Sequence, residues 1–258
     1  MNSILFIIKE NIGCITLHRP QKLNAFNRDM ALQLQKYLDE CASTEEVRCV
    51  YIIGAGKAFS AGQDLEEVMD PKGSGMSVIL KDHYNPIVTK IRNMNKPVVA
   101  AVNGVAAGAA ANIALCCDVV IASSSASFIQ AFSKIGLVPD SGGTYVLPRL
   151  IGWQKAIALT MLGDKVTAEE AEKIGMIYKV FTDDDFEKLS YQIAQKLAQM
   201  PTKGLAFTKQ LFNQSLTNSF ENQLQQEDYF QQKAAQTYDY KEGVQAFLEK
   251  RAPVFKGE

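Results

Sequence analysis

Residues 98–117 read VVAAVNGVAAGAAANIALCC, a run of twenty residues without a charged side chain. Alanine and glycine dominate this run, so another segment can approach its backbone closely. We interpret it as a buried strand, a turn and the beginning of a buried helix that ends before Asp118. The first turn of a helix has backbone N–H groups without intrahelical partners, which can bind a ligand. The run therefore predicts a ligand-binding turn inside an α/β fold.

The length of this run would also suit a membrane-spanning helix. Asn103, Asn112 and two glycines interrupt it, most of its apolar residues are alanine, and no aromatic or basic belt flanks it. We therefore reject the membrane interpretation and expect no membrane partner. The N-terminus, MNSILFIIKE, has a short apolar run and no basic flank, so it predicts a strand rather than a signal peptide.

The overall composition excludes several classes of function. The chain has 258 residues, with 27 Lys and Arg against 28 Asp and Glu, so no general basic field would attract nucleic acid or an anionic membrane. Its five cysteines form no CxxC pair, which predicts free thiols in a reducing, cytoplasmic compartment. His18 and His83 are too few for a histidine triad or a multi-histidine metal site, and we expect no metal. We place His18 at a surface strand end and His83 on a solvated helix face.

Strands and helices alternate up to about residue 145, which predicts βαβ units. Pro86 predicts a kink or a division in its helix, and residues 64–75 show no periodicity and predict a loose segment. The expected strands are Ile4–Lys9, Ile12–His18 (joined by a tight turn at Glu10-Asn11), Val47–Ile53, Pro97–Val102, Asp118–Ala122 and Phe128–Gln130, and the expected helices are Arg28–Ala42, Val78–Met94 and Gly108–Cys116.

Helical patterns dominate the rest of the chain. We therefore divide the chain into an α/β core, residues 1–200, and a C-terminal helical region, residues 201–258. The expected helices are Trp153–Leu162, Thr167–Ile174 with a capping box, Asp184–Met200, Thr202–Asn213, Leu216–Ala235 and Tyr240–Arg251, with one strand at Ile177–Val180.

Two loops rich in small residues follow buried strands: residues 59–65 and 103–110. Ligands bind beyond the carboxyl ends of parallel strands, so these loops are candidates for a shared site. Two ordinary strand-to-helix turns would show the same spacing, and spacing alone does not separate the two interpretations. The stretch Gly54–Lys57 before the first loop does not match a dinucleotide fingerprint, because Phe59 occupies the third glycine position. It does not match a phosphate loop either, because Ala58 stands where Ser or Thr is needed.

Four motifs, in order and spacing, resemble those of the crotonase (enoyl-CoA hydratase/isomerase) superfamily. They are Arg19–Phe26 (RPQKLNAF), Ala58–Leu65 (AFSAGQDL), Lys96–Gly104 (KPVVAAVNG) and Leu137–Thr144 (LVPDSGGT), and with Tyr240–Lys250 the resemblance spans essentially the whole chain. It implies an α/β spiral of ββα turns with a helical C-terminal trimerisation region. It also implies an acyl-CoA substrate, no separate cofactor, and a homotrimer or a dimer of trimers.

The resemblance also implies roles for individual residues. The backbone N–H groups of Gln63 and Ala109 would form an oxyanion hole for the thioester oxygen, where one donor contributes roughly 3–4 kcal/mol to transition-state stabilisation. Phe247 and Lys250 would reach coenzyme A from the C-terminal helix, Lys250 from a neighbouring subunit. The full set of implied coenzyme A contacts is Gln21, Lys22, Leu23, Ala61, Gln63, Asp64, Leu65, Phe247 and Lys250.

Two departures from the family pattern bear on the chemistry. Hydratases of the family place glutamates where this chain has Asn112 and Phe132. Adding water to a double bond requires an acid and a base on that water, and neither residue supplies one. Phe132 would also exclude the water, and together with Tyr84 it would line the acyl pocket. We therefore expect chemistry other than hydration.

Asp140 is the carboxylate that remains at a catalytic position of the family. An Asp before Ser-Gly-Gly is also a common helix N-cap, and this alternative stays open. Its apolar neighbours Ile135, Leu137, Val138 and Pro139 would raise its pKa towards that of a useful base. One carboxylate that removes a proton and returns it elsewhere is the minimal apparatus of an isomerase.

Several stretches more narrowly resemble the ring-1,2-epoxyphenylacetyl-CoA isomerases of phenylacetate catabolism. They are Tyr84–Val88, Asn103–Ala109, Ala131–Leu137 with Pro139-Asp140, and Lys250–Gly257. It implies conversion of the ring epoxide to oxepin-CoA and a double-bond shift in a related enoyl-CoA. Two other functions stay open: an enoyl-CoA or dienoyl-CoA isomerase of fatty-acid oxidation, and a non-catalytic protein that binds acyl-CoA or RNA. The neutral net charge disfavours RNA, so we expect no nucleic-acid partner.

Overall fold

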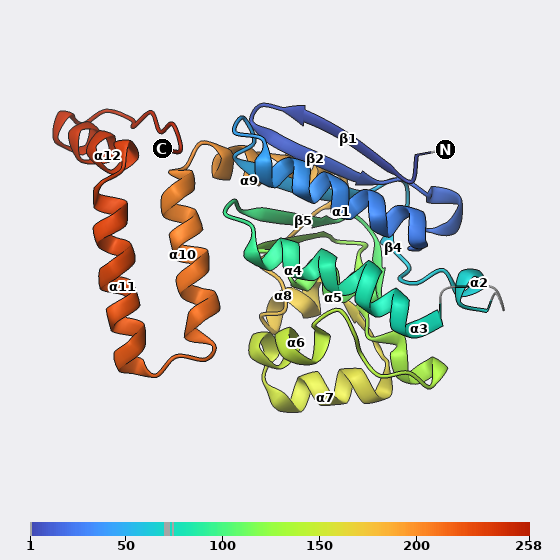
Figure 1. The fold of residues 1–258 in the computed structure, drawn as a ribbon. Helices are drawn as coiled ribbons and strands as arrows, with labels where there is room; N and C mark the ends of the chain where they lie inside the picture. Colours follow the sequence, from blue (N-terminus) through green and yellow to red (C-terminus); the bar gives the residue numbers. More distant parts are fainter. Residues whose placement is uncertain (1, 70–72, 74) are drawn as a thin grey trace.

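The computed structural model describes residues 2–69, 73 and 75–258 and confirms the α/β fold (Figure 1). A six-stranded sheet has the order β1-β2-β3-β5-β7-β10, in which β1 is antiparallel to β2 and the other pairs are parallel. Its strands are β1 Ile4–Lys9, β2 Ile12–Leu17, β3 Cys49–Gly54, β5 Val98–Val102, β7 Val119–Ser123 and β10 Lys179–Phe181. The expected turn between β1 and β2 is confirmed, since Glu10 and Asn11 both have positive φ angles, as a two-residue type I′ hairpin requires.

A second sheet has the order β4-β6-β8-β9, from β4 Ala58–Ser60, β6 Val105–Ala107, β8 Ser127–Ile129 and β9 Lys165–Thr167. The sequence expectation treated β4 as part of a loop and β6 as part of a turn, which is wrong. Strands of three residues are too short to show a period-two pattern, and only their pairing partners reveal them. Strands β3, β5 and β7 of the first sheet each continue into β4, β6 and β8 of the second, so the chain repeats one two-strand step.

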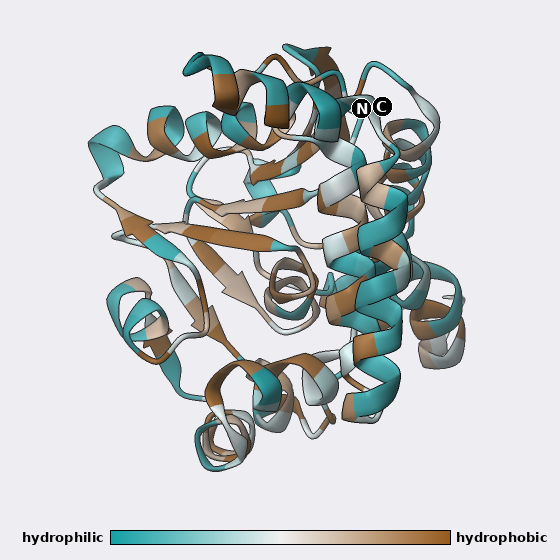
Figure 2. Ribbon diagram, turned by 90° about the vertical axis from the view of Figure 1, so that its left-hand side faces the viewer, coloured by the Kyte–Doolittle hydropathy of each residue, from teal (hydrophilic) through white to brown (hydrophobic). Residues whose placement is uncertain are grey.

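Both faces of the central strands β3, β5 and β7 are covered, as their uninterrupted apolar residues predict. Alternate residues of β5 face α1 (Arg28–Ser43) and α4 (Asn85–Asn93) on one side. The residues between them, Val99 and Ala101, face α9 (Asp183–Ala198) on the other side. Figure 2 shows the result, with mostly hydrophobic central strands and hydrophilic residues on the surrounding helices.

The region around Pro86 forms two α-helical segments joined by a π-helical turn. The turn, Ile79–Tyr84, follows α3 (Gly75–Val78) and leads into α4, where Pro86 occupies the first turn. Pro86 has no N–H to offer the Asp82 carbonyl one turn earlier. Nε2 of Gln35 donates to that carbonyl at 2.7 Å instead, so the division predicted from Pro86 is confirmed and has a specific partner on α1.

The π-helical turn overturns the expectation for His83. Its side chain is only 1% exposed and Nε2 lies 3.1 Å from Nη1 of Arg28. Burial and the positive charge of Arg28 lower the pKa of His83. His83 lies four residues after Ile79 and four before Ile87, and all three are buried, so it belongs to the inward face of this segment.

The remaining helices are short connectors around the core and three long C-terminal helices. Predicted caps are confirmed at two helix starts, since Asn27 accepts from the Met30 N–H at 3.0 Å and Thr167 from the Glu170 N–H at 3.2 Å. Further segments that lacked a clear pattern are also helical, among them α2 and α6. The helices are α2 Leu65–Val68, α5 Ala109–Leu115, α6 Gly143–Ile151, α7 Trp153–Leu162, α8 Ala168–Lys173, α10 Thr202–Ser215, α11 Phe220–Ala235 and α12 Tyr238–Glu249, with 3₁₀ helices at Pro20–Lys22 and Ala131–Ile135.

Asp118, the charge that ends the uncharged run, anchors helix α10. Its Oδ2 accepts from the Val98 N–H at 2.8 Å and from Nζ of Lys209 on α10 at 2.7 Å. Helices α11 and α12 extend beyond α10, at the end of the molecule farthest from α2 and α3 (Figure 1). The division at residue 200 stays a prediction. Within the described residues, every helix is too short or too polar to span a bilayer.

Candidate active site

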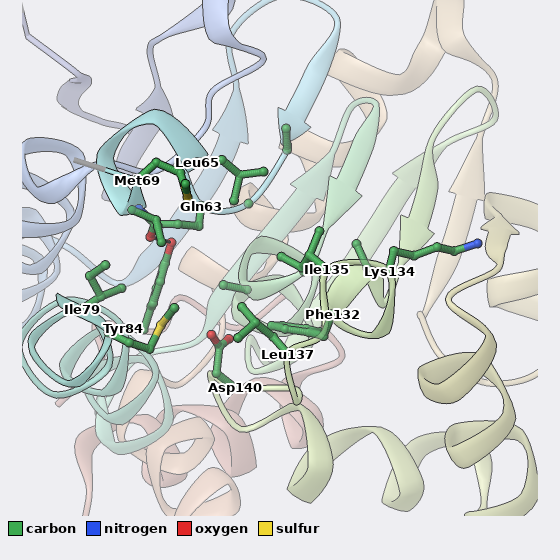
Figure 3. Close-up of a pocket in the computed structure, with 17 residues that line it drawn as sticks. Gln63, Leu65, Met69, Ile79, Tyr84, Phe132, Lys134, Ile135, Leu137 and Asp140 are labelled. Carbon is green, nitrogen blue, oxygen red and sulfur yellow. Dashed lines mark hydrogen bonds between the residues drawn. The ribbon is translucent and has the colours of Figure 1, made fainter. Parts of the chain in front are cut away.

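A cavity of about 480 Å³ opens between the two loops, the π-helical turn and the segment before α6 (Figure 3). It brings together Gln63, Ala109, Asp140, Tyr84 and Phe132, five residues that the sequence analysis had taken from separate segments. The other lining residues are mostly apolar: Ala61, Gly62, Leu65, Val68, Met69, Met76, Ile79, Gly108, Ala131, Lys134, Ile135 and Leu137.

The two loops touch at Gly62. A Cβ atom there would lie 2.7 Å from the Ala107 carbonyl oxygen, and the φ angle of +90° also favours glycine. The Gly62 carbonyl accepts from the Phe26 N–H at 2.7 Å, and the Asp64 N–H donates to the Phe26 carbonyl at 2.8 Å. Since successive N–H groups of an extended segment point in opposite directions, the Gln63 N–H points away from Phe26. Ala109 is the first residue of α5, so its N–H has no intrahelical acceptor.

The Gln63 side chain is fixed from both ends of its amide. The Tyr84 hydroxyl donates to Oε1 of Gln63 at 2.6 Å, as Figure 3 shows, and Nε2 donates to the Glu67 carboxylate at 3.0 Å. Glu67 in turn accepts from the Arg28 N–H at 2.8 Å. Burial raises the pKa of Tyr84 well above its ordinary value, with the negative charge of Asp140 as the next cause. Tyr84 therefore stays a neutral hydrogen-bond donor.

Asp140 lies in a turn with left-handed backbone at Ser141 and Gly142, whose φ angles are 51° and 78°. Oγ of Ser141 donates to Oδ1 of Asp140 at 2.9 Å. Helix α6 begins at Gly143 with Gly142 as its N-cap, so the N-cap alternative for Asp140 is excluded. Burial raises the pKa of Asp140, and the Ser141 hydrogen bond partly opposes that rise. The raised pKa agrees with the expectation from the sequence. Val138, one of the four neighbours expected to bury the carboxyl, is 80% exposed and does not contribute to that burial.

The residues at the two hydratase glutamate positions have different surroundings. Phe132 lines the cavity, with its ring tip 3.8 Å from the position a Cβ would take on Gly108. Asn112 is buried behind Asp140. Its Nδ2 donates to the Asp140 carbonyl at 2.9 Å, and its Oδ1 accepts from Nε2 of Gln130 at 2.8 Å.

Seven of the predicted coenzyme A contacts gather near one rim of the cavity, and two do not. Ala61, Gln63 and Leu65 line the cavity, and Lys22 reaches Glu66 on α2 at 2.6 Å. Asp64 pairs with Arg19 at 2.9 Å, which ties this loop to the segment containing Gln21 and Leu23. Phe247, which is 82% exposed, and Lys250 belong to the α12 region at the other end of the chain. One chain therefore does not bring these two residues to the cavity.

Several residues in and around the cavity could not be identified from the sequence. Met69 lines its wall from the segment 64–75, which showed no periodicity, and Met76 and Ile79 line it from just after that segment. Gln130 and Ser141 are buried next to the cavity rather than in its wall, where Ser141 donates to Asp140 and Gln130 donates to Asn112. Pro86 requires an irregular helix, and it was the feature of the sequence that could have indicated the cavity wall around Ile79 and Tyr84.

Known proteins resemble this chain along its whole length. The sequence profile described as enoyl-CoA hydratase/isomerase matches residues 7–258. A 1,2-epoxyphenylacetyl-CoA isomerase of Escherichia coli K12 is 44% identical over 263 residues, covering 100% of both chains. A probable enoyl-CoA hydratase of Rhodobacter capsulatus is 42% identical, covering 99% of this chain and 98% of that one. The crystal structure of an enoyl-CoA hydratase/isomerase from Mycobacterium abscessus, 33% identical, superposes with a TM-score of 0.94 over 99% of this chain and 100% of that chain. These likenesses confirm the predicted crotonase fold, and the chain belongs to the enoyl-CoA hydratase/isomerase family of enzymes.

Proposed function

We propose that this enzyme is an acyl-CoA isomerase in which Asp140 moves a proton within the acyl group. The observation that carries the proposal is the composition of the cavity. Among its described lining residues, Asp140 has the one carboxylate, and it shares the cavity with the loops of Gln63 and Ala109. A single acid beside two backbone donors fits proton transfer next to a thioester.

The proposed chemistry divides between the backbone and the carboxylate. The N–H groups of Gln63 and Ala109 would stabilise the negative charge that develops on the thioester oxygen when a neighbouring proton is removed. Burial raises the pKa of Asp140, which makes it a stronger base than an ordinary aspartate. The same carboxyl group can then return the proton at another atom, so the reaction needs no water and no cofactor.

Hydration fits this cavity poorly, although one relative is named a probable hydratase. The Asn112 amide is engaged behind Asp140 rather than facing the cavity, and Phe132 fills the second glutamate position with an apolar ring. The arrangement offers one carboxylate where the addition of water requires both an acid and a base.

For the substrate we propose ring-1,2-epoxyphenylacetyl-CoA, which would be converted to oxepin-CoA, with a double-bond shift in a related enoyl-CoA as a second reaction. The name of the Escherichia coli relative supports this choice, and so do the aromatic rings of Tyr84 and Phe132 in a largely apolar wall. Coenzyme A would lie along the rim formed by Gln21, Lys22, Leu23, Ala61, Asp64 and Leu65. Phe247 and Lys250 would complete its site from another subunit of a trimer or hexamer.

A substrate panel on the purified protein and its Asp140→Asn variant tests this proposal. The panel contains the ring-epoxide thioester, straight-chain enoyl- and dienoyl-CoA esters, and a saturated acyl-CoA as a binding probe. We expect turnover of the ring epoxide and a loss of at least about 10²-fold in kcat with Asn, while the saturated ester still binds. Preferred turnover of the straight-chain esters would indicate a fatty-acid isomerase instead. Binding without turnover of any ester would indicate a non-catalytic protein, and full activity of Asp140→Asn would contradict the role of Asp140.

A further inference from the structure

A chain of amide hydrogen bonds lies behind Asp140, in the otherwise apolar core. Nε2 of Gln130 donates to Oδ1 of Asn112 at 2.8 Å, and Nδ2 of Asn112 donates to the backbone carbonyl of Asp140 at 2.9 Å. Asn112 and Gln130 are both buried. The chain therefore connects the interior of α5 to the turn that carries the candidate base.

The Asp140 carbonyl determines the direction of this chain. A carbonyl oxygen can only accept, so the Asn112 amide must present its nitrogen to Asp140 and its oxygen to Gln130. Gln130 must then present its own nitrogen, and its Oε1 is left buried with no partner among the described residues. Leaving a buried acceptor unpaired is unfavourable, so the fold tolerates a local cost to hold the Asn112 amide in one orientation.

The turn that receives this hydrogen bond needs to be held. Ser141 is left-handed although it is not glycine, which is a strained backbone state that persists only when its surroundings impose it. Gly143 provides room for the amide, because a Cβ atom there would lie 2.3 Å from Nδ2 of Asn112. The absence of that Cβ lets the Asn112 amide reach the Asp140 carbonyl.

We infer that Asn112 is a positioning residue, which holds the turn of Asp140, Ser141 and Gly142 so that the carboxylate faces the cavity, and that Gln130 fixes the orientation of the Asn112 amide. This inference deepens the proposed function and rests on it. Asn112 acts through Asp140 and lies outside the cavity wall. Its effect should therefore appear in the rate of the chemical step and in the titration of Asp140, rather than in substrate affinity.

Two substitutions test the inference by independent routes. Asn112→Ala removes the donor, and Gly143→Ala keeps the donor but pushes it away with a new Cβ. The new Cβ meets the end of the Asn112 side chain rather than backbone, so the side chain can move aside and the second variant should fold even if the first does not. Asn213→Ala is the matched control, because Nδ2 of Asn213 also donates to a backbone carbonyl, that of Arg92 at 2.9 Å, away from the cavity.

We expect both test variants to lower kcat by roughly 10- to 100-fold, since small misplacements of a reacting group have effects of this size, with KM changed less than about threefold. The acid limb of the pH–rate profile should move to lower pH, because a released Asp140 carboxylate reaches water. The control should alter thermal stability alone. Unchanged kcat in the variants that fold, or losses of kcat no larger than in Asn213→Ala, would overturn the inference.

A measurement without substrate separates this inference from the proposed function. The Asp140 carboxyl can be titrated by carbon NMR in the wild-type protein and in both variants, with Asp140→Asn to assign its signal. The inference predicts a lower pKa for this carboxyl in Asn112→Ala and in Gly143→Ala. An unchanged titration in both would contradict it. Failure of the wild-type enzyme to isomerise any thioester would overturn the proposed function, while the titration still decides the role of Asn112.

Discussion

The hydroxyl of Tyr84 donates a hydrogen bond of 2.6 Å to the side-chain oxygen of Gln63. Tyr84 ends the π-helical turn, and Gln63 belongs to the loop after β4, so this bond joins two walls of the cavity. Glu67 extends the connection by accepting from Gln63 at 3.0 Å and from the Arg28 N–H at 2.8 Å. The backbone that presents the Gln63 N–H is thus held through its own side chain.

Tyr84→Phe should loosen this backbone while it keeps the aromatic wall. One hydrogen bond contributes about 0.5–1.5 kcal/mol, so we expect kcat/KM to fall by up to roughly tenfold. Steady-state kinetics with the preferred thioester measure this change. Tyr51→Phe is the control, since the Tyr51 hydroxyl lies 2.8 Å from Oγ of Ser190 on the other face of the sheet. A loss of kcat/KM as large in Tyr51→Phe would show that Tyr84 acts through general stability.

Ala109→Pro should remove one of the two proposed oxyanion donors and leave the helix in place. Proline is well tolerated at the first position of a helix, where the N–H has no intrahelical partner. We expect kcat to fall by roughly 10²- to 10³-fold, the usual effect of losing one such donor, with far-ultraviolet circular dichroism unchanged. Phe220→Pro, at the first position of α11, controls for the substitution itself. Wild-type kcat in Ala109→Pro would remove Ala109 from the oxyanion hole.

The pH dependence of activity should report Asp140 directly. Burial raises the pKa of its carboxyl above the ordinary 3.8, so a base at this position loses activity as the pH falls through that raised value. Ser141→Ala removes the hydrogen bond that opposes the rise, and the acid limb of kcat/KM should therefore move to higher pH. Ser190→Ala, another buried serine, should leave the limb in place. A limb that moves to lower pH in Ser141→Ala would contradict this assignment.

The Asp140 carboxylate should also lower the stability of the folded protein at neutral pH. Its pKa is higher in the folded than in the unfolded chain, so folding favours the protonated form, and stability is lost as the pH rises through the folded value. Asp140→Asn removes this penalty. We expect a higher melting temperature for the variant at pH values near 7 and a difference that shrinks below the ordinary pKa of 3.8. Scanning calorimetry across this range checks the sign, and a variant less stable at neutral pH would contradict it.

Most of the fold could be predicted from local patterns. A few neighbouring residues determine each of three features. These are the strands of the large sheet between Ile4 and Val102, the capped starts of α1 and α8, and the division of the helix at Pro86. The second sheet could not be predicted in this way, because strands as short as β4 and β6 are defined by their partners. His83 was misplaced because its polar side chain was taken to indicate exposure, although it lies four residues from both Ile79 and Ile87, which are buried.

The same distinction between sequence and tertiary structure applies to the candidate site. The sequence by itself determined which residue types are present: two loops that can expose N–H groups, one Asp at position 140, and Asn112 and Phe132 where hydratases have glutamates. Only the tertiary structure decided that Asp140 is free of helix capping, that Tyr84 holds Gln63, and that Asn112 supports the turn of Asp140. It also left Phe247 and Lys250, which belong to the α12 region, at the end of the molecule farthest from α2 and α3. Capping and periodicity act between neighbours in sequence, whereas the direction of a buried amide depends on partners that folding brings from distant segments.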